Sequence, residues 1–487
     1  MKAAYLFVLT SAVATVALAA VGPDYKRPAP LPIGEVPGAY AGSTNVWQPA
    51  EPQAHRPRGD WWQLFGDTEL NRLETDGAAA NQDLTAAVAR FNQARAVLNV
   101  AKAGYFPHLS ADPSYSRTRD SANRPLNGRP ALASETYNTF TVPLDLTWEL
   151  DLWGRVRRQV ESTRSQLEAG AADLEAVRLE MHAEIAADYF TLRAQEDELA
   201  LLQSTAVAQS KALELTRNRR AGGIATDLDV AQAETQLRTT EAQIPAVDLE
   251  RTKSLHALAT LTGRPAGTMT IASRTNAEPS ATGLEWEAGL PSELLQRRPD
   301  IAAAERRMAA ANADIGVAKA AFYPSFQFSA NAGFQSIGAS SLFDWPSRLW
   351  AIGPSMSLPL FEGGRNRAGL ARARAVWDET VAHYRQTVLT AFQEVEDQLA
   401  ARRLLAAQAT AETSAMTAAR RALEIASNRY KGGLVTYLEV ATAQQNALDR
   451  EREVARLRGE QQVAAVALVK ALGGGWEAQS VLAATKP

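Results

Sequence analysis

Two long proline-free stretches with apolar residues at helical spacing dominate the chain. Arg155–Ala221 and Arg365–Lys431 each place apolar side chains at the intervals of a coiled coil. At 1.5 Å per residue, each stretch predicts a helix on the order of 100 Å long. The seam residues are Leu167, Leu174, Met181, Ile185, Leu192 and Leu199 in the first stretch, and Trp377, Val381, Tyr384, Val388, Ala391 and Val395 in the second.

Each long stretch ends in a near-copy of one motif, which predicts the tip of a helical hairpin. The first tip, about residues 218–230, reads Asn-Arg-Arg-Ala-Gly-Gly-Ile-Ala-Thr-Asp-Leu-Asp-Val; the second, about 428–442, begins Asn-Arg-Tyr-Lys-Gly-Gly-Leu-Val-Thr-Tyr-Leu-Glu-Val. The glycine pairs Gly222-Gly223 and Gly432-Gly433 supply a left-handed residue that ends a helix. Thr226 and Thr436 are placed to cap the return helices, with Asp229 and Glu439 at the capping-box position. The first return helix contains Pro245, which predicts a kink or a junction there.

Four shorter segments alternate apolar and polar residues, as half-buried strands do. They cover about residues 108–117, 138–150, 325–335 and 350–360, and form one two-strand hairpin in each half of the chain. A helix over 69–104 precedes the first hairpin, and a polar loop over about 118–135 connects its strands. Aromatic side chains lie toward the strand ends, at Tyr115, Phe140, Trp148 and Trp350.

Because the helix, strand hairpin and helical hairpin recur in the same order, we expect two internal repeats. The predicted divisions are a signal peptide (1–19), an extended proline-rich leader (20–60), the first repeat (61–263), a linker (264–290), the second repeat (291–475) and a tail (476–487). A membrane anchor is the alternative for the first segment, whose apolar run nearly reaches spanning length.

Composition narrows the possible functions. The 487 residues carry 51 basic and 54 acidic side chains, which gives no electrostatic case for nucleic acid, and the absence of cysteine excludes thiolate sites. The five histidines, at 55, 108, 182, 256 and 383, match no zinc or phosphate-loop motif. An enzyme is therefore not expected, and no cofactor is implied.

The strands decide the fold class. Their polar faces suit a wet lumen and their apolar faces suit lipid, yet four strands cannot close a membrane barrel and an open edge in lipid is forbidden. Three copies would supply 3 × 4 = 12 strands, whereas two copies would give eight, whose side chains nearly fill the interior. We therefore expect an α+β membrane protein: a trimeric 12-stranded β-barrel with four strands per chain, continued by a long α-helical coiled-coil barrel.

Several motifs, together and in order, resemble the TolC-like outer membrane factors, in particular the OprM/NodT-like branch that serves resistance–nodulation–division efflux pumps. They are Val21-Gly22-Pro23-Asp24-Tyr25-Lys26-Arg27-Pro28, Trp61-Trp62-Gln63-Leu64-Phe65-Gly66-Asp67, Arg297-Arg298-Pro299-Asp300-Ile301, Ala321-Phe322-Tyr323-Pro324-Ser325, Leu358-Pro359-Leu360-Phe361-Glu362-Gly363-Gly364-Arg365 and the two tips.

The resemblance implies a homotrimer in the outer membrane of a Gram-negative bacterium, with a periplasmic helical barrel closed at its tip and a belt built from leader and linker. The tip would dock on a periplasmic membrane-fusion adaptor protein bound to an inner-membrane pump, and small toxic compounds would leave through the duct. Members often carry a lipid-bearing cysteine before the Val-Gly-Pro motif. Here that position is Ala19, so we expect no lipid anchor and cleavage after Ala19.

Candidate functional residues lie at the tips. Asp227, Asp229 and Glu439 are candidates for acidic rings at a closed aperture, with Tyr437 and Thr442 beside them; the alternative is that Asp229 and Glu439 only complete capping boxes. Candidate adaptor contacts are Gly222, Gly223, Thr226, Arg219, Gly432, Gly433, Thr436 and Arg429. The glycines serve the turn geometry first and an adaptor second, and a solvated helix end with favourable dipole charges is the favoured single explanation for the arginines. Two other functions stay open: a type I protein-secretion component, and a soluble periplasmic coiled-coil scaffold.

Overall fold

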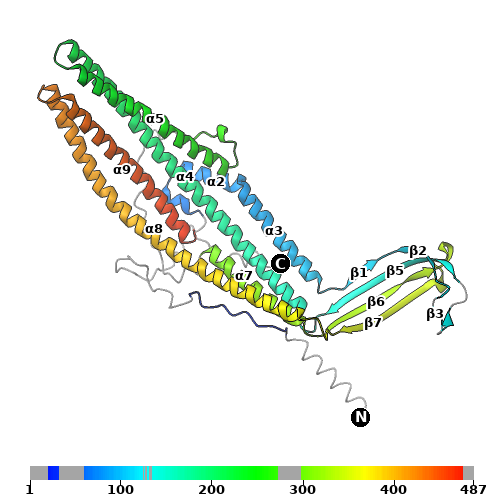
Figure 1. Ribbon diagram of the computed structural model, residues 1–487. Coiled ribbons are helices and arrows are strands. Elements are labelled where there is room, and N and C mark those ends of the chain that lie inside the picture. The colour runs from blue at the N-terminus through cyan, green and yellow to red at the C-terminus, as the bar shows by residue number, and fades with distance from the viewer. Residues whose placement is uncertain are drawn as a thin grey trace. The chain divides into compact units, whose positions relative to one another are not determined.

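The computed structural model describes residues 20–31, 60–123, 125–126, 129–130, 134–272 and 298–474, and within these it separates two compact units. The sheet unit contains the described parts of 1–28, 92–169 and 304–384; the helical unit contains those of 29–91, 170–303 and 385–487 (Figure 1). The helices are η1 (Trp61–Phe65), α2 (Thr68–Ala80), α3 (Gln82–Ala103), α4 (Arg155–Ala221), α5 (Asp227–Leu261), η2 (Ala266–Thr268), α7 (Pro299–Ala320), η3 (Ala339–Ser341), η4 (Trp345–Ser347), α8 (Arg365–Lys431) and α9 (Tyr437–Ala471).

The long helices confirm the predicted rods. Helices α4 and α8 each run for 67 residues without interruption, and each turns back at its tip into a 35-residue helix, α5 or α9. Helices α5 and α9 lie side by side in the helical unit. Helix α5 passes through Pro245 as one helix, so of the two predicted outcomes at this proline the junction is excluded and the kink stays a prediction. The coiled-coil spacing is confirmed by complete burial of Ile185, Leu192, Tyr384 and Val388.

The single helix expected over residues 69–104 is wrong: the structure has two helices that meet at Asn81. Asn81 adopts an extended backbone, and its Oδ1 accepts the amide hydrogen of Leu84 at 2.9 Å. Its Nδ2 donates to the carbonyl of Leu261 at 2.9 Å. The side chain thus caps α3 and ties it to the end of α5, which the local apolar spacing cannot reveal because the partner is distant in sequence.

A histidine–glutamate pair is buried in the core of the helical unit. His182 Nδ1 lies 2.7 Å from Glu74 Oε2, and the ring of Trp62 stacks on the imidazole at 4.2 Å. Burial raises the pKa of Glu74 to about 9. Burial, and then the charge of Arg178, lowers the pKa of His182 to about 4. These pKa shifts favour the neutral form of both groups near pH 7, joined by one hydrogen bond.

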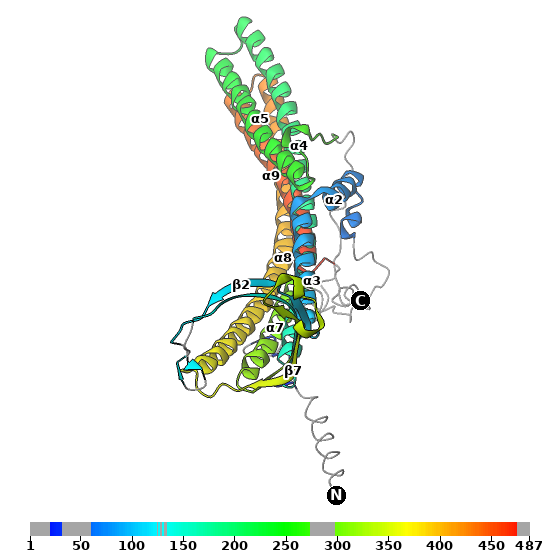
Figure 2. The same ribbon diagram turned by 90° about the vertical axis from the view of Figure 1, so that its right-hand side faces the viewer.

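The sheet unit contains an antiparallel sheet whose central strands pair the two halves of the chain. Its strands are β1 (His108–Ala111), β2 (Ser114–Arg119), β5 (Thr136–Leu150), β6 (Ser325–Ser336) and β7 (Arg348–Ser357); β3 (Pro125–Leu126) and β4 (Arg129–Pro130) form a separate small ladder. The order is β1-β5-β6-β7, with β2 also paired to β5. In Figure 2 the loop end of the sheet faces the viewer, with β2 and β7 at opposite edges.

The first predicted strand is interrupted. Pairing to β5 runs from His108 to Ala111 and resumes at Ser114, so Asp112 and Pro113 lie outside the ladder. Proline lacks the amide hydrogen that a ladder needs, and it is tolerated at a sheet edge. The two strands β1 and β2 thus form one broken edge.

Register places the two kinds of side chain on opposite faces, as the alternation predicts. The polar row Ser110, Asp145 and Asn331 lies across three neighbouring strands, and Asn331 Nδ2 donates to Asp145 Oδ1. The opposite face exposes apolar side chains: Leu109, Leu144, Trp148, Trp350, Ile352 and Met356. Among the described parts of this chain, nothing covers that face.

The N-terminal motif packs on the helices of the sheet unit. The amide of Val21 donates to the carbonyl of Trp153 at 2.9 Å, and Asn312 Nδ2 donates to the carbonyl of Pro23 at 3.0 Å. Ion pairs join Asp24 to Arg158 (3.0 Å) and Arg27 to Glu305 (3.1 Å). These contacts explain the polar positions of a motif that the sequence showed only as a resemblance.

Within the described ranges, no helix combines the length and the apolar character needed to cross a membrane. The signal peptide at 1–19, most of the leader and linker, and the tail from 475 onward lie outside the described residues, so those predictions stay predictions.

Candidate functional site: the tips of the helical hairpins

The two tips have the same backbone geometry. In the first, the amides of Gly223 and Ile224 donate to the carbonyls of Arg220 and Arg219; in the second, Gly433 and Leu434 repeat both bonds. Gly223 and Gly433 have φ angles of 74° and 75°, which favour glycine. The preceding glycines have ordinary φ angles and room for a Cβ atom, so only the second glycine of each pair is required by the turn.

The first return helix has the predicted capping box. Thr226 Oγ1 accepts the amide hydrogen of Asp229 at 3.2 Å, and Asp229 Oδ2 accepts that of Thr226 at 2.8 Å. The second return helix lacks it, because the side chain of Thr436 makes no capping hydrogen bond. The capping-box interpretation of Glu439 is therefore wrong.

Asp229 instead serves both hairpins. Its Oδ1 lies 3.3 Å from the backbone nitrogen of Tyr437, the first residue of α9. Burial alone would raise the pKa of Asp229, but the hydrogen bonds from Thr226 and the Tyr437 amide hold the pKa below its usual value. One carboxylate thus occupies the positive ends of α5 and α9.

A cluster of aromatic rings fills the space beneath the tips. Tyr437 is 1% exposed, and its ring meets that of Tyr430 edge-on at 5.4 Å. The guanidinium of Arg219 lies 4.8 Å from the Tyr430 ring centre and donates to the carbonyl of Lys431 at 3.1 Å. Arg219 therefore links the hairpins and does not point only into solvent. The structure places Tyr437 in the core of this cluster.

The remaining predicted gate residues are exposed. Asp227 pairs with Arg220, and Glu439 lies 3.7 Å from Arg429, each on its own hairpin. Thr442 donates its hydroxyl hydrogen to the carbonyl of Leu438, one helical turn back. In one chain, then, Asp227 and Glu439 are accessible carboxylates, whereas Asp229 is engaged by backbone.

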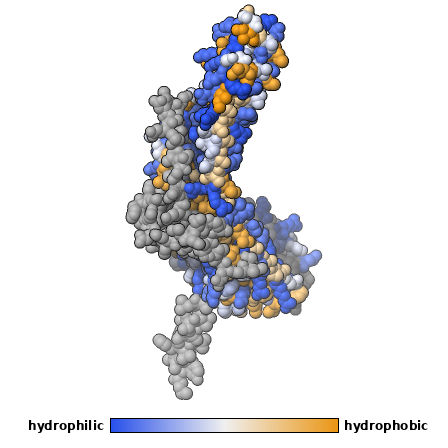
Figure 3. All heavy atoms as spheres, turned by 90° about the vertical axis from the view of Figure 1, so that its left-hand side faces the viewer, coloured by the Kyte–Doolittle hydropathy of each residue, from blue (hydrophilic) through white to orange (hydrophobic). Residues whose placement is uncertain are grey.

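Apolar side chains that the sequence reasoning missed also lie at the tips. Ile224 and Leu228 of the first tip are 69% and 66% exposed, and Leu434 and Leu438 at the matching positions of the second are 75% and 56% exposed. Figure 3 shows such apolar residues gathered at the end of the hairpins. We call these four residues the tip patch. The sequence carried a signal for this patch: Ile224 and Leu434 are large apolar residues at matching turn positions, where polar residues are the rule.

The predicted aromatic residues of the sheet lie near both of its ends. Tyr115 and Phe140 are directly opposite each other, with ring centres 4.8 Å apart, toward the loop end. Trp148 lies toward the helix end and donates its indole hydrogen to the carbonyl of Tyr105 at 3.1 Å. Trp350 is 77% exposed, opposite Ala332.

Comparison with known proteins decides the family. The sequence matches the family model described as outer membrane efflux protein over residues 76–264 and 290–474. The chain belongs to this outer membrane efflux protein family. Outer membrane protein OprJ of Pseudomonas aeruginosa is 33% identical over 465 residues, which cover 95% of this chain and 94% of OprJ. The probable efflux pump outer membrane protein TtgC of Pseudomonas putida is 33% identical over 462 residues, 94% of this chain and 93% of TtgC.

Among solved structures, the outer-membrane channel OprN aligns with a TM-score of 0.84 at 32% identity, covering 94% of this chain and 99% of that one. The resemblance to TolC-like outer membrane factors is thereby confirmed. This efflux protein resides in the outer membrane, and its family consists of channels with a mostly helical fold and a sheet. The soluble-scaffold alternative is set aside.

Proposed function

We propose that three copies of this efflux protein form one passive export duct, with a 12-stranded barrel in the outer membrane and a helical barrel in the periplasm. The observation that carries the proposal is the sheet with two unpaired edges, β1/β2 and β7, and an exposed apolar face. Such a sheet satisfies its backbone in lipid only if neighbouring copies pair with its edges. Each chain would contribute two repeats, 61–263 and 291–475, to the ring.

In this arrangement the polar face of the sheet lines the lumen. Asp145 and Asn331 would then face the exported compounds, and Trp148 and Trp350 would lie in lipid near the interfaces. The duct itself performs no chemistry. It conducts small toxic compounds that a separate pump delivers.

We propose that the tips contact a periplasmic adaptor protein, which itself binds an inner-membrane pump of the resistance–nodulation–division type. The tip patch supports this role, because four exposed apolar residues in pairs suit burial against a protein. The turns at Gly222-Gly223 and Gly432-Gly433 present the patch, and Thr226, Thr436, Arg219 and Arg429 flank it. The carboxylates of Asp227, Asp229 and Glu439 would ring the closed aperture in the trimer, with Thr442 and the buried Tyr437 beside them.

An export assay tests the adaptor contact. In a strain that lacks its own copy, the double variant Ile224→Asp with Leu434→Asp should reach the outer membrane in normal amount and fail to restore resistance to toxic compounds. Ile337→Asp is the matched control, because Ile337 is also 75% exposed but follows β6. Full resistance from the double variant would contradict a role for the tip patch.

A further inference from the structure

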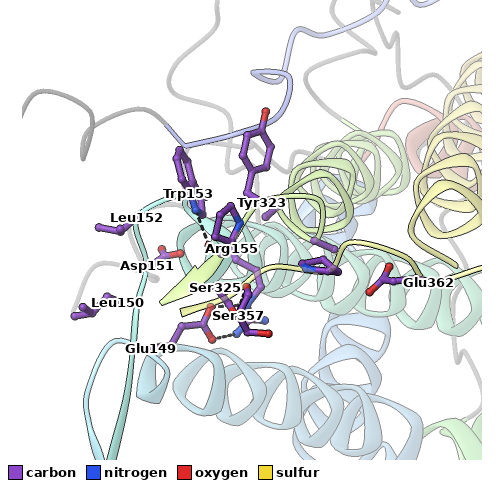
Figure 4. A pocket seen from close by; sticks show the side chains of 14 residues that line it. Glu149, Leu150, Asp151, Leu152, Trp153, Arg155, Tyr323, Ser325, Ser357 and Glu362 are labelled. Atoms are coloured by element: carbon purple, nitrogen blue, oxygen red, sulfur yellow. Dashed lines mark hydrogen bonds and ion pairs between the residues drawn. The ribbon is translucent and has the colours of Figure 1, made fainter. Parts of the chain in front are cut away.

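An aromatic contact closes the junction where β5 leaves the sheet and β6 enters it. Trp153 follows β5, Tyr323 precedes β6, and their ring centres lie 5.0 Å apart. The indole Nε1 of Trp153 donates to the carbonyl of Pro324 at 2.7 Å. Figure 4 shows Trp153 and Tyr323 side by side at a cavity of about 250 Å³, beside the ion pair of Glu149 and Arg155.

Each partner of this contact has a counterpart in the other half of the chain. The turn Gly104-Tyr105-Phe106-Pro107 before β1 matches Ala321-Phe322-Tyr323-Pro324 before β6, so Phe106 corresponds to Tyr323. The exit Leu152-Trp153-Gly154-Arg155 matches Leu360-Phe361 and then Gly364-Arg365 after β7, so Phe361 corresponds to Trp153. Gly154 and Gly364 both have positive φ angles, 78° and 89°, directly before α4 and α8, which supports the correspondence.

The counterpart residues have no such contact within the described chain. Phe361 is 92% exposed, Leu360 is 89% exposed and Phe106 is 69% exposed. They cannot meet inside one copy, because β1 and β7 lie at opposite edges of the sheet with β5 and β6 between them. Three strand spacings of about 4.8 Å put roughly 14 Å between the two edges.

We infer that Phe361 and Leu360 of each copy pack on the Tyr105–Phe106–Pro107 turn of the next copy. The inference rests on the proposed trimer. When β7 of one copy lies beside β1 of the next, Phe361 stands to Phe106 as Trp153 stands to Tyr323 across β5 and β6. The occupant of these exposed apolar residues is therefore a second copy of this chain. The contact is apolar only, because Phe361 has no indole hydrogen to donate.

Cysteine cross-linking tests the contact, since the natural chain has no cysteine. The pair Trp153→Cys with Tyr323→Cys calibrates the reagent, because those positions touch within one chain. Any oxidant, or short thiol-reactive cross-linker with a reducible linkage, that bridges this pair inside the chain should bridge Phe106→Cys with Phe361→Cys between chains. We expect dimers and trimers on denaturing gels from the second pair, loss of them on reduction, and no trimers from either single variant.

The result separates two failures. Suppose that light scattering in detergent shows trimers, and that the calibrating pair is cross-linked but the Phe106–Phe361 pair is not. In that case the proposed contact is wrong, and the proposed trimer is unaffected. If the wild-type protein is not trimeric, the proposed function fails first. Should the double variant not accumulate, Leu360→Cys with Pro107→Cys probes the same contact. Phe361→Ala should also lower the temperature at which trimers dissociate in SDS, and Ile337→Ala should leave it unchanged; equal temperatures for Phe361→Ala and wild type would overturn the inference.

Discussion

Replacing Asp229 with alanine would weaken the link between the two hairpin tips while leaving the turns intact. The carboxylate accepts hydrogen bonds from the amide and hydroxyl of Thr226, both at 2.8 Å, and from the amide of Tyr437 at 3.3 Å. Loss of the capping box costs typically about 1 kcal/mol. The longer bond to Tyr437 adds about 0.5 kcal/mol, toward the low end for a net hydrogen bond.

Together these losses come to about 1.5 kcal/mol of local stability, which corresponds to a roughly tenfold larger population of the opened tip, if the starts of α5 and α9 open together. Hydrogen exchange reports such local opening directly, because the Tyr437 amide exchanges when the tip opens. Asp229→Ala should therefore speed exchange in the peptide that contains Tyr437 by about tenfold at neutral pH. The pKa of Asp229 is lowered in the folded protein. Its contribution to the stability of the tip is therefore present above pH 3.8 and is lost as the pH falls below that value.

Asp227→Ala is the matched control. Asp227 lies two residues away and carries the same charge, but it makes only an exposed ion pair with Arg220. Exposed pairs contribute little, so exchange at Tyr437 should remain close to wild type. Equal exchange in Asp229→Ala and Asp227→Ala would refute the proposed link between the hairpins.

Three further predictions follow from the same structure. Glu439→Ala should reduce the cation preference of single channels and lower the stability of α9 by no more than about 1 kcal/mol, since Glu439 caps no helix and contributes only its charge in the first turn. Unchanged conductance and cation preference in both this variant and Asp229→Ala would contradict the acidic gate. Because the pKa of Glu74 is raised to about 9 in the folded protein, the contribution of Glu74 to stability is complete below pH 4.5 and is lost as the pH rises toward 9. Glutamine does not titrate, so the thermal midpoint of Glu74→Gln should rise relative to that of the wild type over this pH range. A pH-independent difference between Glu74→Gln and wild type would contradict the neutral pair. Gly263→Ala should destabilise the protein by about 2 kcal/mol or more, because a Cβ atom would lie 2.5 Å from the carbonyl oxygen of Ala80 and φ is 68°. Gly66 has a φ of 66° and open space around a Cβ atom, so Gly66→Ala should lose only the stability that backbone strain costs. Thermal unfolding compares the two variants.

The spacing of apolar residues along the chain was enough to predict the long helices and the strands. The ends of α4 and α8 coincide with the predicted ones, because a glycine pair and a positive-φ glycine delimit each helix. The strands followed from alternation, but the break at Pro113 was missed, and so was the short β3–β4 ladder inside the segment predicted as a polar loop. Where a single residue makes a long-range contact, as Asn81 does with Leu261, the apolar spacing carries no trace of it.

The tips show the same limit. Thr226 and Thr436 occupy matching sequence positions, yet only Thr226 caps its helix. Nor does either motif show that Asp229 reaches the amide of Tyr437, across 208 positions of sequence. His182 is likewise an isolated histidine in the sequence, and its role appears only when α2 brings Glu74 against it. Near-identical motifs therefore predicted a shared backbone geometry, but not which side chain would serve both hairpins.

The number of copies in the detergent-solubilised protein tests the central claim most directly. Native mass spectrometry of the complex extracted from outer membranes should give three chains, because four strands with two open edges need sister strands to close in lipid. A stable single chain, with its apolar sheet face and both strand edges unpaired, would contradict the proposed duct.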